Sequence, residues 1–416
     1  MTSHDRTMHM AATLSRRNVL RSGAALAATT SLASAFPTVA GAAASATSTD
    51  ASASPAGRLL VVFLRGAADH LSITVPLDEP HYHDARPTIA IDPDATLPLD
   101  DRFGLHPAMP RLHARYNAGE VAPVVAVGNP AANRSHFLSQ DLFERGSDGS
   151  DDLGDGWLAR HLNASATRSD GALRAITVGA NVDESLIGFP ALGMTSLSTF
   201  GLSRAGDFAG PLEDMMRGLH ASGSYLDQAA IQALDAAAVV AGLPASQQRN
   251  RTAAAFEDIV TLFDADLGIE AITVSIDGWD THDRMGNVEE GYMKDLLEGL
   301  DTTLGIMLDG FDEIGIDDVT TLVVTEFGRR VAENGSEGCD HGWASSALVI
   351  GNGIDGGRVH GDWPGLDRDV VRDSNGDVPM TTDYRDLLGE VATATLGADP
   401  TILFPDHSFE PVGVTT

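Results

Sequence analysis

Short runs of consecutive apolar residues alternate along this chain with longer segments in which apolar residues recur every three or four positions. A continuous apolar run is typical of a strand buried on both faces of a sheet, and the wider spacing is typical of an amphipathic helix. Strands that alternate with helices indicate an α/β fold, here a three-layer α/β/α sandwich with a mostly parallel central sheet. The runs predict strands at 58–64, 121–127, 173–178, 271–276, 320–324 and 345–350.

The helical pattern is strongest in the second half of the chain. Apolar residues at helical intervals predict an amphipathic helix over 288–314 and a last helix over 383–396. Residues 206–268 are rich in alanine and contain few helix breakers. They predict either a helical segment inserted into the domain or two long helices that flank the sheet. A proline-rich stretch, 76–107, is expected to be a loop.

Residues 1–44 have the pattern of an export signal. Arg16 and Arg17 precede an apolar, alanine-rich run at 24–35, and small residues suitable for cleavage follow. Paired arginines favour the twin-arginine route, and an ordinary signal with two basic residues is the alternative. We therefore expect an exported protein, periplasmic or extracellular, that engages the twin-arginine export machinery.

The remainder of the chain is acidic and globular in composition. Residues 45–57 have low complexity and predict a disordered linker, and 58–416 are expected to form a single domain. No run after the signal is long enough for a stable membrane span. The formal net charge of −32 disfavours nucleic acid as a partner, because both would be anionic. Cys339 is the only cysteine, which excludes an intramolecular disulfide and a cysteine-based zinc site.

Polar side chains follow three of the predicted strands. Asp69 comes after the first strand, Asp280 and His282 follow the strand at 271–276, and Glu326 follows the next strand along the chain. Because parallel strands bring their carboxyl ends to one edge of a sheet, we expect these groups to lie there together. Carboxylates and imidazoles are ligands of divalent metals, so this edge is a candidate metal site.

Each of these groups also has a structural interpretation. Asp69 is equally well explained as a helix cap or turn residue. In a polar loop, Asp280 would only orient His282. Glu326 and Arg329 would form a buried ion pair that stabilises the edge of the sheet. This interpretation is as well supported as a site in which Arg329 binds an anion.

Two further segments carry candidate chemistry. Asp340 and His341 are adjacent in a glycine-rich loop, where the backbone can come close to a metal and both side chains can serve it. Ser135 stands beside Arg134 at the predicted start of a helix, where its hydroxyl is a candidate nucleophile or metal ligand and the local positive potential favours an anion. An ordinary N-cap serine is the favoured alternative when this residue is taken alone.

Several short motifs together resemble an exported bacterial family, the domain of unknown function family 1501. They include Gly-Trp-Asp-Thr-His at 278–282, Thr-Glu-Phe-Gly-Arg at 325–329 and Asp-His-Gly at 340–342. The resemblance spans about 58–410, and further matching segments stand at 64–69, 86–91, 103–107, 134–137 and 361–365. The family is similar in plan to the alkaline phosphatase and sulfatase superfamily, which implies an α/β/α sandwich that holds two divalent metals.

The resemblance also implies roles for individual residues. Asp69 takes the place of the first metal ligand, Ser135 that of the nucleophile, and His341 that of the last histidine ligand. Asp280 and His282 take the place of an aspartate–histidine pair, at shorter spacing than usual.

One position departs from the superfamily pattern. A second aspartate–histidine pair is expected where Glu326 and Phe327 stand, and a phenyl ring cannot bind a metal. Asp340 is the residue placed to compensate.

These observations support two main hypotheses, and a third, carbohydrate binding, rests only on Trp279, Trp343 and Trp363 near polar loops. The first is an exported metal-dependent hydrolase of an anionic ester, a phosphate or sulfate, that uses zinc, manganese or calcium, with Arg134 or Arg329 binding the anion. The second is a non-catalytic, degenerate hydrolase fold that binds or assembles a component of the cell envelope. Stoichiometric metal bound by the candidate ligands would distinguish the hypotheses.

Overall fold

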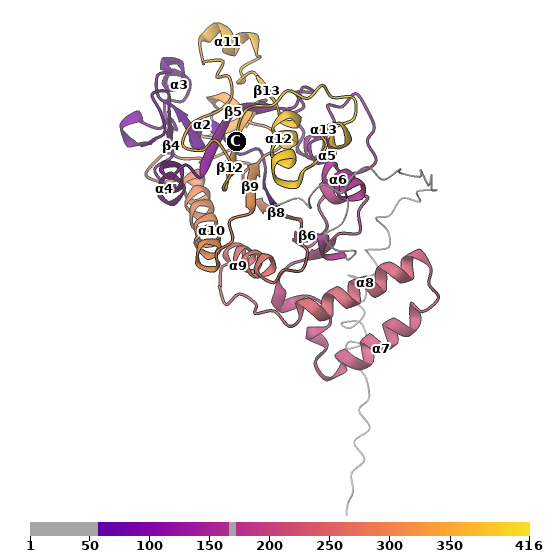
Figure 1. Cartoon of the computed structure of the whole chain (residues 1–416). Coiled ribbons are helices and arrows are strands. Elements are labelled where there is room, and N and C mark those ends of the chain that lie inside the picture. The colour runs from indigo at the N-terminus through magenta and orange to yellow at the C-terminus, as the bar shows by residue number, and fades with distance from the viewer. Residues whose placement is uncertain (1–56, 166–171) are drawn as a thin grey trace, which may run out of the picture. The chain divides into compact units, whose positions relative to one another are not determined.

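The computed structural model describes residues 57–165 and 172–416. The predicted signal, 1–44, and residues 45–56 of the predicted linker lie outside the described residues. Figure 1 shows a central sheet with helices around it. No helix of the described part is long and apolar enough to cross a membrane.

An eight-stranded sheet in the order β13-β5-β12-β9-β1-β8-β6-β7 forms the centre of the described part. All neighbouring strands are parallel except β12, which is antiparallel to both β5 and β9. The predicted mostly parallel sheet is therefore confirmed. The strands are β1 (Arg58–Arg65), β5 (Val121–Gly128), β6 (Ala175–Val178), β7 (Leu192–Met194), β8 (Ala271–Asp277), β9 (Val319–Val324), β12 (Ser345–Ile350) and β13 (Thr382–Asp383).

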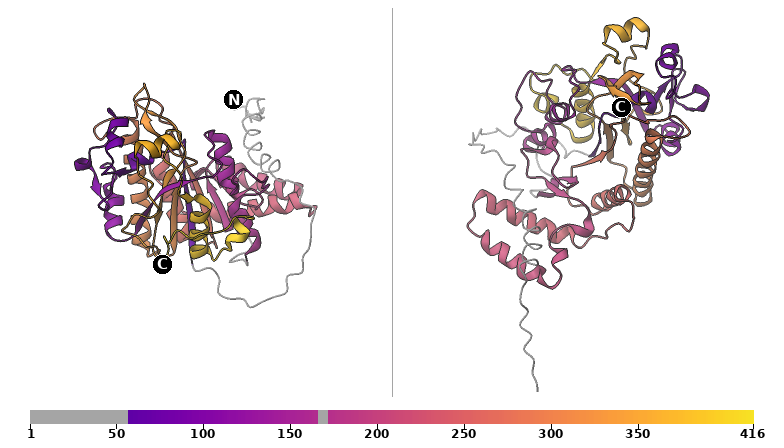
Figure 2. Two further views of the ribbon diagram at one scale, coloured as in Figure 1. Left: turned by 90° about the horizontal axis from the view of Figure 1, so that it is seen from above. Right: turned by 180° about the vertical axis from the view of Figure 1, so that it is seen from behind.

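Helices cover both faces of this sheet, as Figure 2 shows from above. Because side chains alternate along a strand, β1 sends Leu60, Val62 and Leu64 into one core and Leu59, Val61 and Phe63 into the other. The first core packs against α4 (Pro110–Asn117), α9 (Arg251–Asp264) and α10 (Tyr292–Ile314). The second packs against α5 (His136–Arg145), α6 (Trp157–Ala164), α12 (Tyr384–Leu396) and α13 (Pro400–Leu403). This arrangement confirms the predicted three-layer α/β/α sandwich.

The alanine-rich region at 206–268 contains three helices with different environments. In α9, Phe256, Ile259 and Leu262 are buried in the core beneath the sheet. None of the described residues of α7 (Ala209–Leu219) is buried, and α7 lies beside α8 (Tyr225–Val240), away from the sheet (Figure 1). Helix α9 thus belongs to one helical layer of the sandwich, and α7 and α8 extend outward from that layer.

Two small antiparallel sheets lie outside the predicted pattern. One, in the order β2-β4-β3, contains β2 (Thr74–Pro76), β3 (Leu97–Pro98) and β4 (Phe103–Leu105), and most of it falls within the expected proline-rich loop. The other pairs β10 (Arg329–Glu333) with β11 (Cys339–His341). Short helices complete the described part, among them α2 (His70–Ile73), α3 (Pro80–Ala85) and α11 (Arg368–Asp373).

Candidate metal centre

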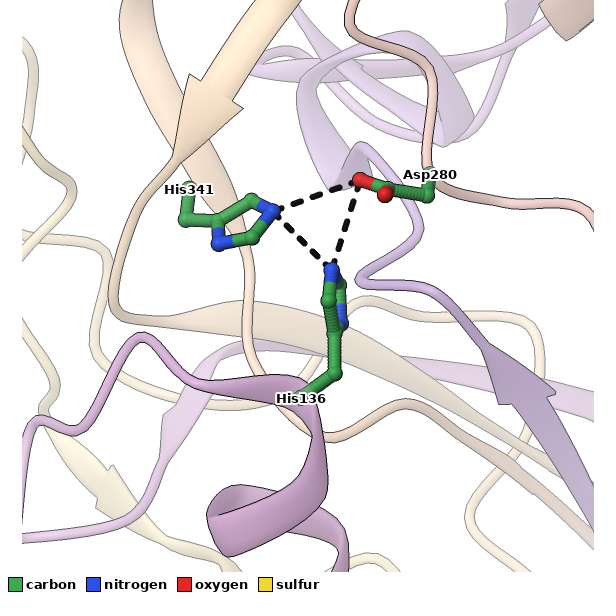
Figure 3. A group of neighbouring side chains, drawn as sticks. All are labelled: His136, Asp280 and His341. Atoms are coloured by element: carbon green, nitrogen blue, oxygen red, sulfur yellow. Dashed lines mark hydrogen bonds and ion pairs between the residues drawn. The ribbon is translucent and has the colours of Figure 1, made fainter.

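Four side chains from three elements meet at the carboxyl edge of the sheet. His136 is the first residue of α5, Asp280 and His282 follow β8, and His341 ends β11. Figure 3 shows His136, Asp280 and His341 pointing toward one another. The short hairpin β10–β11 carries His341 to this edge, so residues that are more than 200 positions apart become neighbours.

The ligand atoms are spaced as donors around one small cation are. His136 Nε2 lies 2.9 Å from His341 Nε2, and Asp280 Oδ1 lies 3.3 Å from His341 Nε2 and 3.4 Å from His136 Nε2. Ligands about 2.0–2.1 Å from a tetrahedral zinc ion are about 3.3 Å apart. These three residues therefore form a group that can hold a metal ion.

His282 extends this group on its exposed side. Its Nε2 atom lies 2.9 Å from His341 Nε2 and 3.1 Å from Asp280 Oδ1. Its Nδ1 atom lies 3.3 Å from Asp340 Oδ1, which also accepts a hydrogen bond from Asn334. Asp340 is therefore placed to orient His282.

Oxygen acceptors fix the tautomers of the two inner histidines. The backbone carbonyl of Arg134 lies 2.8 Å from His341 Nδ1 and can only accept, so this nitrogen carries the proton. Glu326 Oε1 lies 2.8 Å from His136 Nδ1, and the ionised carboxylate likewise only accepts. In both neutral imidazoles the lone pair on Nε2 therefore points into the cluster.

Glu326 lies behind His136, with a side chain that is 0% exposed. Burial alone would raise the pKa of this carboxyl, but hydrogen bonds from His136, Gln140 and the backbone lower it below its usual value. The hydrogen bond to Glu326 in turn raises the pKa of His136. A buried carboxylate behind a ligating imidazole is a common means of orienting a metal ligand. Glu326 thus holds His136 from behind and is not one of the three grouped ligand residues.

Arg329 is buried behind Asp280 and forms an ion pair with it. Its guanidinium is 0% exposed and donates to Asp280 Oδ1 over 2.6 Å. Burial opposes ionisation of Asp280, but Arg329 outweighs it and brings the pKa of this carboxyl to about 2. The same guanidinium donates to the backbone carbonyls of Gly66, Ala67, Trp279 and Cys339. Arg329 therefore holds the loops of the site together, and its donors are engaged within the protein.

Two other predicted residues lie at the rim. Arg134 forms an ion pair with Asp377, and only its backbone carbonyl contacts the cluster, through His341. Ser135 is the exposed N-cap residue of α5, and its hydroxyl caps no described backbone N–H. Ser135 is therefore accessible next to His136.

Asp69 lies in a different environment. Both of its oxygens accept hydrogen bonds from Arg86, over 2.6 and 2.8 Å, and Ser72 donates to one of them over 2.6 Å. Within the described part, no contact joins Asp69 to the clustered ligands. The structure thus brings together Asp280, His282, Asp340 and His341, with Glu326 behind them, and places Asp69 in a buried ion pair.

Phe327 packs against the cluster at the position where a ligand was expected. Its ring stacks on His136, with centroids 5.0 Å apart, and lies 5.2 Å from the ring of His341. Phe327 cannot bind a metal, but its ring restricts the positions of the imidazoles of His136 and His341.

His136 is the residue of this cluster that the sequence analysis did not single out. It lies within the matching segment at 134–137, next to Ser135. Its position after a buried strand, at the start of a helix, is the signal that would have identified it.

The sequence of this chain matches the family model described as "Protein of unknown function (DUF1501)" over residues 56–416, so the chain belongs to that family. This confirms the predicted membership. A comparison with curated proteins gives no match.

Solved structures give distant similarities. The C-terminal periplasmic domain of EcEptC from Escherichia coli, in complex with Zn, has 9% identity and a TM-score of 0.41, covering 86% of this chain and 89% of its own. A protein in the alkaline phosphatase superfamily from Vibrio parahaemolyticus has 11% identity and a TM-score of 0.35, covering 74% of this chain and 64% of its own. At these values, neither similarity defines the function of this chain.

Proposed function

We propose that this member of the DUF1501 family is an exported, metal-dependent hydrolase of an anionic ester, a phosphate or a sulfate. The facing Nε2 atoms of His136 and His341 carry the proposal. In the neutral tautomers set by Glu326 and the Arg134 carbonyl, two lone pairs face each other over 2.9 Å. That contact is repulsive unless a cation or a shared proton lies between the nitrogens.

The ligand types favour a particular metal. His136, His341 and Asp280 would hold the ion, and His282 would be a fourth ligand or the group that closes the site. Imidazole nitrogens suit zinc, whereas calcium prefers oxygen ligands alone. Zinc is therefore the favoured metal, followed by manganese.

The protein would divide the remaining work among residues around the metal. A bound divalent metal supplies Lewis-acid polarisation of the ester and a more acidic bound water. Ser135, exposed next to His136, is the candidate nucleophile. Glu326 and Phe327 keep the ring of His136 in place, and Arg329 keeps Asp280 ionised.

Metal content is the decisive measurement. Purified folded protein should contain about one equivalent of zinc or manganese by elemental mass spectrometry. His341→Ala and His136→Gln should each abolish binding, because each removes a donor from the centre of the cluster. His113→Ala, which changes a histidine on α4 outside the cluster, should retain the metal. Absence of metal after purification and after incubation with zinc and manganese salts would rule out the proposal.

A non-catalytic binding role is the second candidate, and the arginines favour it. The two predicted anion-binding side chains are already engaged, Arg134 by Asp377 and Arg329 by Asp280. Metal-loaded protein should be assayed with p-nitrophenyl phosphate and p-nitrophenyl sulfate. Hydrolysis that Ser135→Ala or His341→Ala abolishes supports the enzyme. Stoichiometric metal without hydrolysis of either ester supports the binding role.

A further inference from the structure

Arg330, on the hairpin that carries His341, has a guanidinium without a partner in the protein. Arg330 is partly buried, and within the described residues no hydrogen bond or ion pair joins its side chain to another group. We propose that Arg330 binds the anionic group of the substrate, a tetrahedral oxyanion, beside the metal. The inference rests on the proposed hydrolase and specifies the residue that recognises the acid part of its substrate.

An unpaired guanidinium is unusual in so acidic a chain. Aspartate and glutamate outnumber lysine and arginine by 59 to 27, so carboxylate partners are abundant. Both arginines predicted to bind an anion are paired, Arg134 with Asp377 and Arg329 with Asp280. Arg330 has no such partner and is therefore available to a ligand. Its planar fork of donors suits the oxygens of a phosphate or a sulfate.

The hairpin β10–β11 holds Arg330 next to the clustered ligands. Arg330 follows Arg329, whose partner across the hairpin is His341. The backbone carbonyl of Arg330 accepts a hydrogen bond from the buried Arg86 over 2.9 Å, which anchors this part of β10. Because successive side chains of a strand point to opposite faces, Arg330 points away from the buried side on which Arg329 lies. The main chain of Arg330 is thus fixed, and its side chain points away from the interior.

The guanidinium lies over a turn at the edge of the site. A Cβ atom added to Gly376 would lie 3.2 Å from Arg330 Nη1, so glycine at this position leaves room for the guanidinium. The next residue, Asp377, pairs with Arg134, and the backbone carbonyl of Arg134 orients His341. The guanidinium of Arg330 therefore lies one residue from the ion pair that borders the cluster.

The charge of Arg330 acts on carboxylates at two sides of the cluster. A hydrogen bond from Asn334 lowers the pKa of Asp340, and the charge of Arg330 adds to this effect. Burial raises the pKa of Asp377, against the charges of Arg134 and Arg330. In the described part, neither carboxylate forms an ion pair with Arg330, because Asn334 and Arg134 bind them instead. The positive potential at this edge is therefore left for an anion.

Titration of zinc-loaded protein with inorganic phosphate, and separately with inorganic sulfate, tests the inference. Isothermal titration should show saturable binding of at least one of the two anions. Arg330→Gln should weaken that binding about tenfold or more and keep the zinc, because it removes an anion-binding charge and no metal ligand. Arg330→Lys should retain part of the affinity, since the charge remains without the planar fork.

Arg249→Gln is the matched control. Arg249 is exposed, precedes α9 and likewise forms no hydrogen bond or ion pair within the part of the chain that the structure describes. Its replacement removes the same charge away from the cluster, so anion binding should equal that of the natural protein. This control separates a local contact from the effect of net charge.

The outcomes separate this inference from the proposed hydrolase. Zinc-loaded Arg330→Gln that binds the anion as well as the natural protein would overturn the role of Arg330 and leave the metal centre standing. Equal weakening by Arg330→Gln and Arg249→Gln, or no saturable binding of either anion by the natural protein, would also overturn it. A natural protein that takes up no zinc would contradict the hydrolase itself, together with this inference, and its metal content shows this before any anion is added.

Discussion

Asp69 and Asp280 follow neighbouring parallel strands, β1 and β8, at the same edge of the sheet, yet the structure uses them differently. The side chain of Asp69 is 0% exposed, and Arg86 occupies both of its oxygens. The side chain of Asp280 is 47% exposed, and its Oδ1 faces Arg329 and several imidazoles. One carboxylate is closed off by its partner, and the other remains open to a ligand.

Acidity alone does not distinguish the two residues. Burial opposes ionisation of both carboxyls, an arginine outweighs it at each, and both pKa values are about 2. The two residues differ in their surroundings. Arg86 binds both oxygens of Asp69, whereas imidazole nitrogens face Asp280. A low pKa therefore identifies an ion pair at this sheet edge, and only the convergence of imidazoles identifies a metal site.

Removing Arg86 should have the largest effect on the buried carboxylate. Arg86→Met leaves the charge of Asp69 without its partner in a fully buried position. We expect a loss of about 3–5 kcal/mol in the free energy of unfolding, measured with urea. Adding Asp69→Asn to this variant should restore part of the loss, because it removes the charge. A loss below about 1 kcal/mol would show that this pair is not structural.

Replacing Asp280, the exposed carboxylate, should affect metal binding more than stability. Asp280→Asn removes an anionic ligand from a half-exposed position, so we expect zinc affinity to fall about 100-fold or more. The free energy of unfolding of the metal-free protein should fall by less than in Arg86→Met, because the asparagine oxygen can still accept a hydrogen bond from the buried Arg329. Chelator competition and urea unfolding measure the two quantities. Unchanged zinc affinity would remove Asp280 from the site.

A smaller effect is expected at Glu326, which reaches the metal only through His136. Glu326→Gln weakens the acceptor that holds the imidazole, and zinc affinity should fall about 10–100-fold, measured by the same competition. Glu313→Gln, on the exposed face of α10, is the matched control and should have no effect. A complete loss equal to that of His341→Ala would instead indicate that Glu326 binds the metal directly.

The sequence predicted the sandwich because its strongest signals are local. The continuous apolar runs correspond to strands of the central sheet, such as β1 and β5, and the leucine spacing corresponds to α10. The runs did not show β7, which has three residues, or the hairpin β10–β11. β7 is held by its pairing with β6, and β10 and β11 are held by an irregular pairing with each other, and hydrophobic spacing reports neither pairing.

The site was only partly predictable for the same reason. Strand-end position placed Asp280, His282 and Glu326 at the correct edge, but it also selected Asp69. Tertiary contacts distinguish the two aspartates: Arg86 pairs with Asp69, and imidazoles surround Asp280. The stacking of Phe327 on His136 likewise brings together a loop and a helix that lie far apart in sequence.

The smallest effect is expected at Glu184, in the segment after β6, which provides a pH-dependent counterpart to the two aspartates. Burial, a hydrogen bond with Asp141 and the charge of Glu144 raise the pKa of Glu184 to about 7, against the opposing charge of Arg145. The folded protein therefore binds a proton that the unfolded chain releases near pH 4.5, so Glu184 stabilises the fold below that pH. This contribution is lost as the pH rises through about 7. Because the side chain is substantially exposed, the effect should be small.

Urea unfolding measures the expected effect. Between pH 5 and pH 8, the free energy of unfolding should fall less for Glu184→Gln than for the natural protein. An identical drop in the two proteins would mean that Glu184 is already ionised at pH 5.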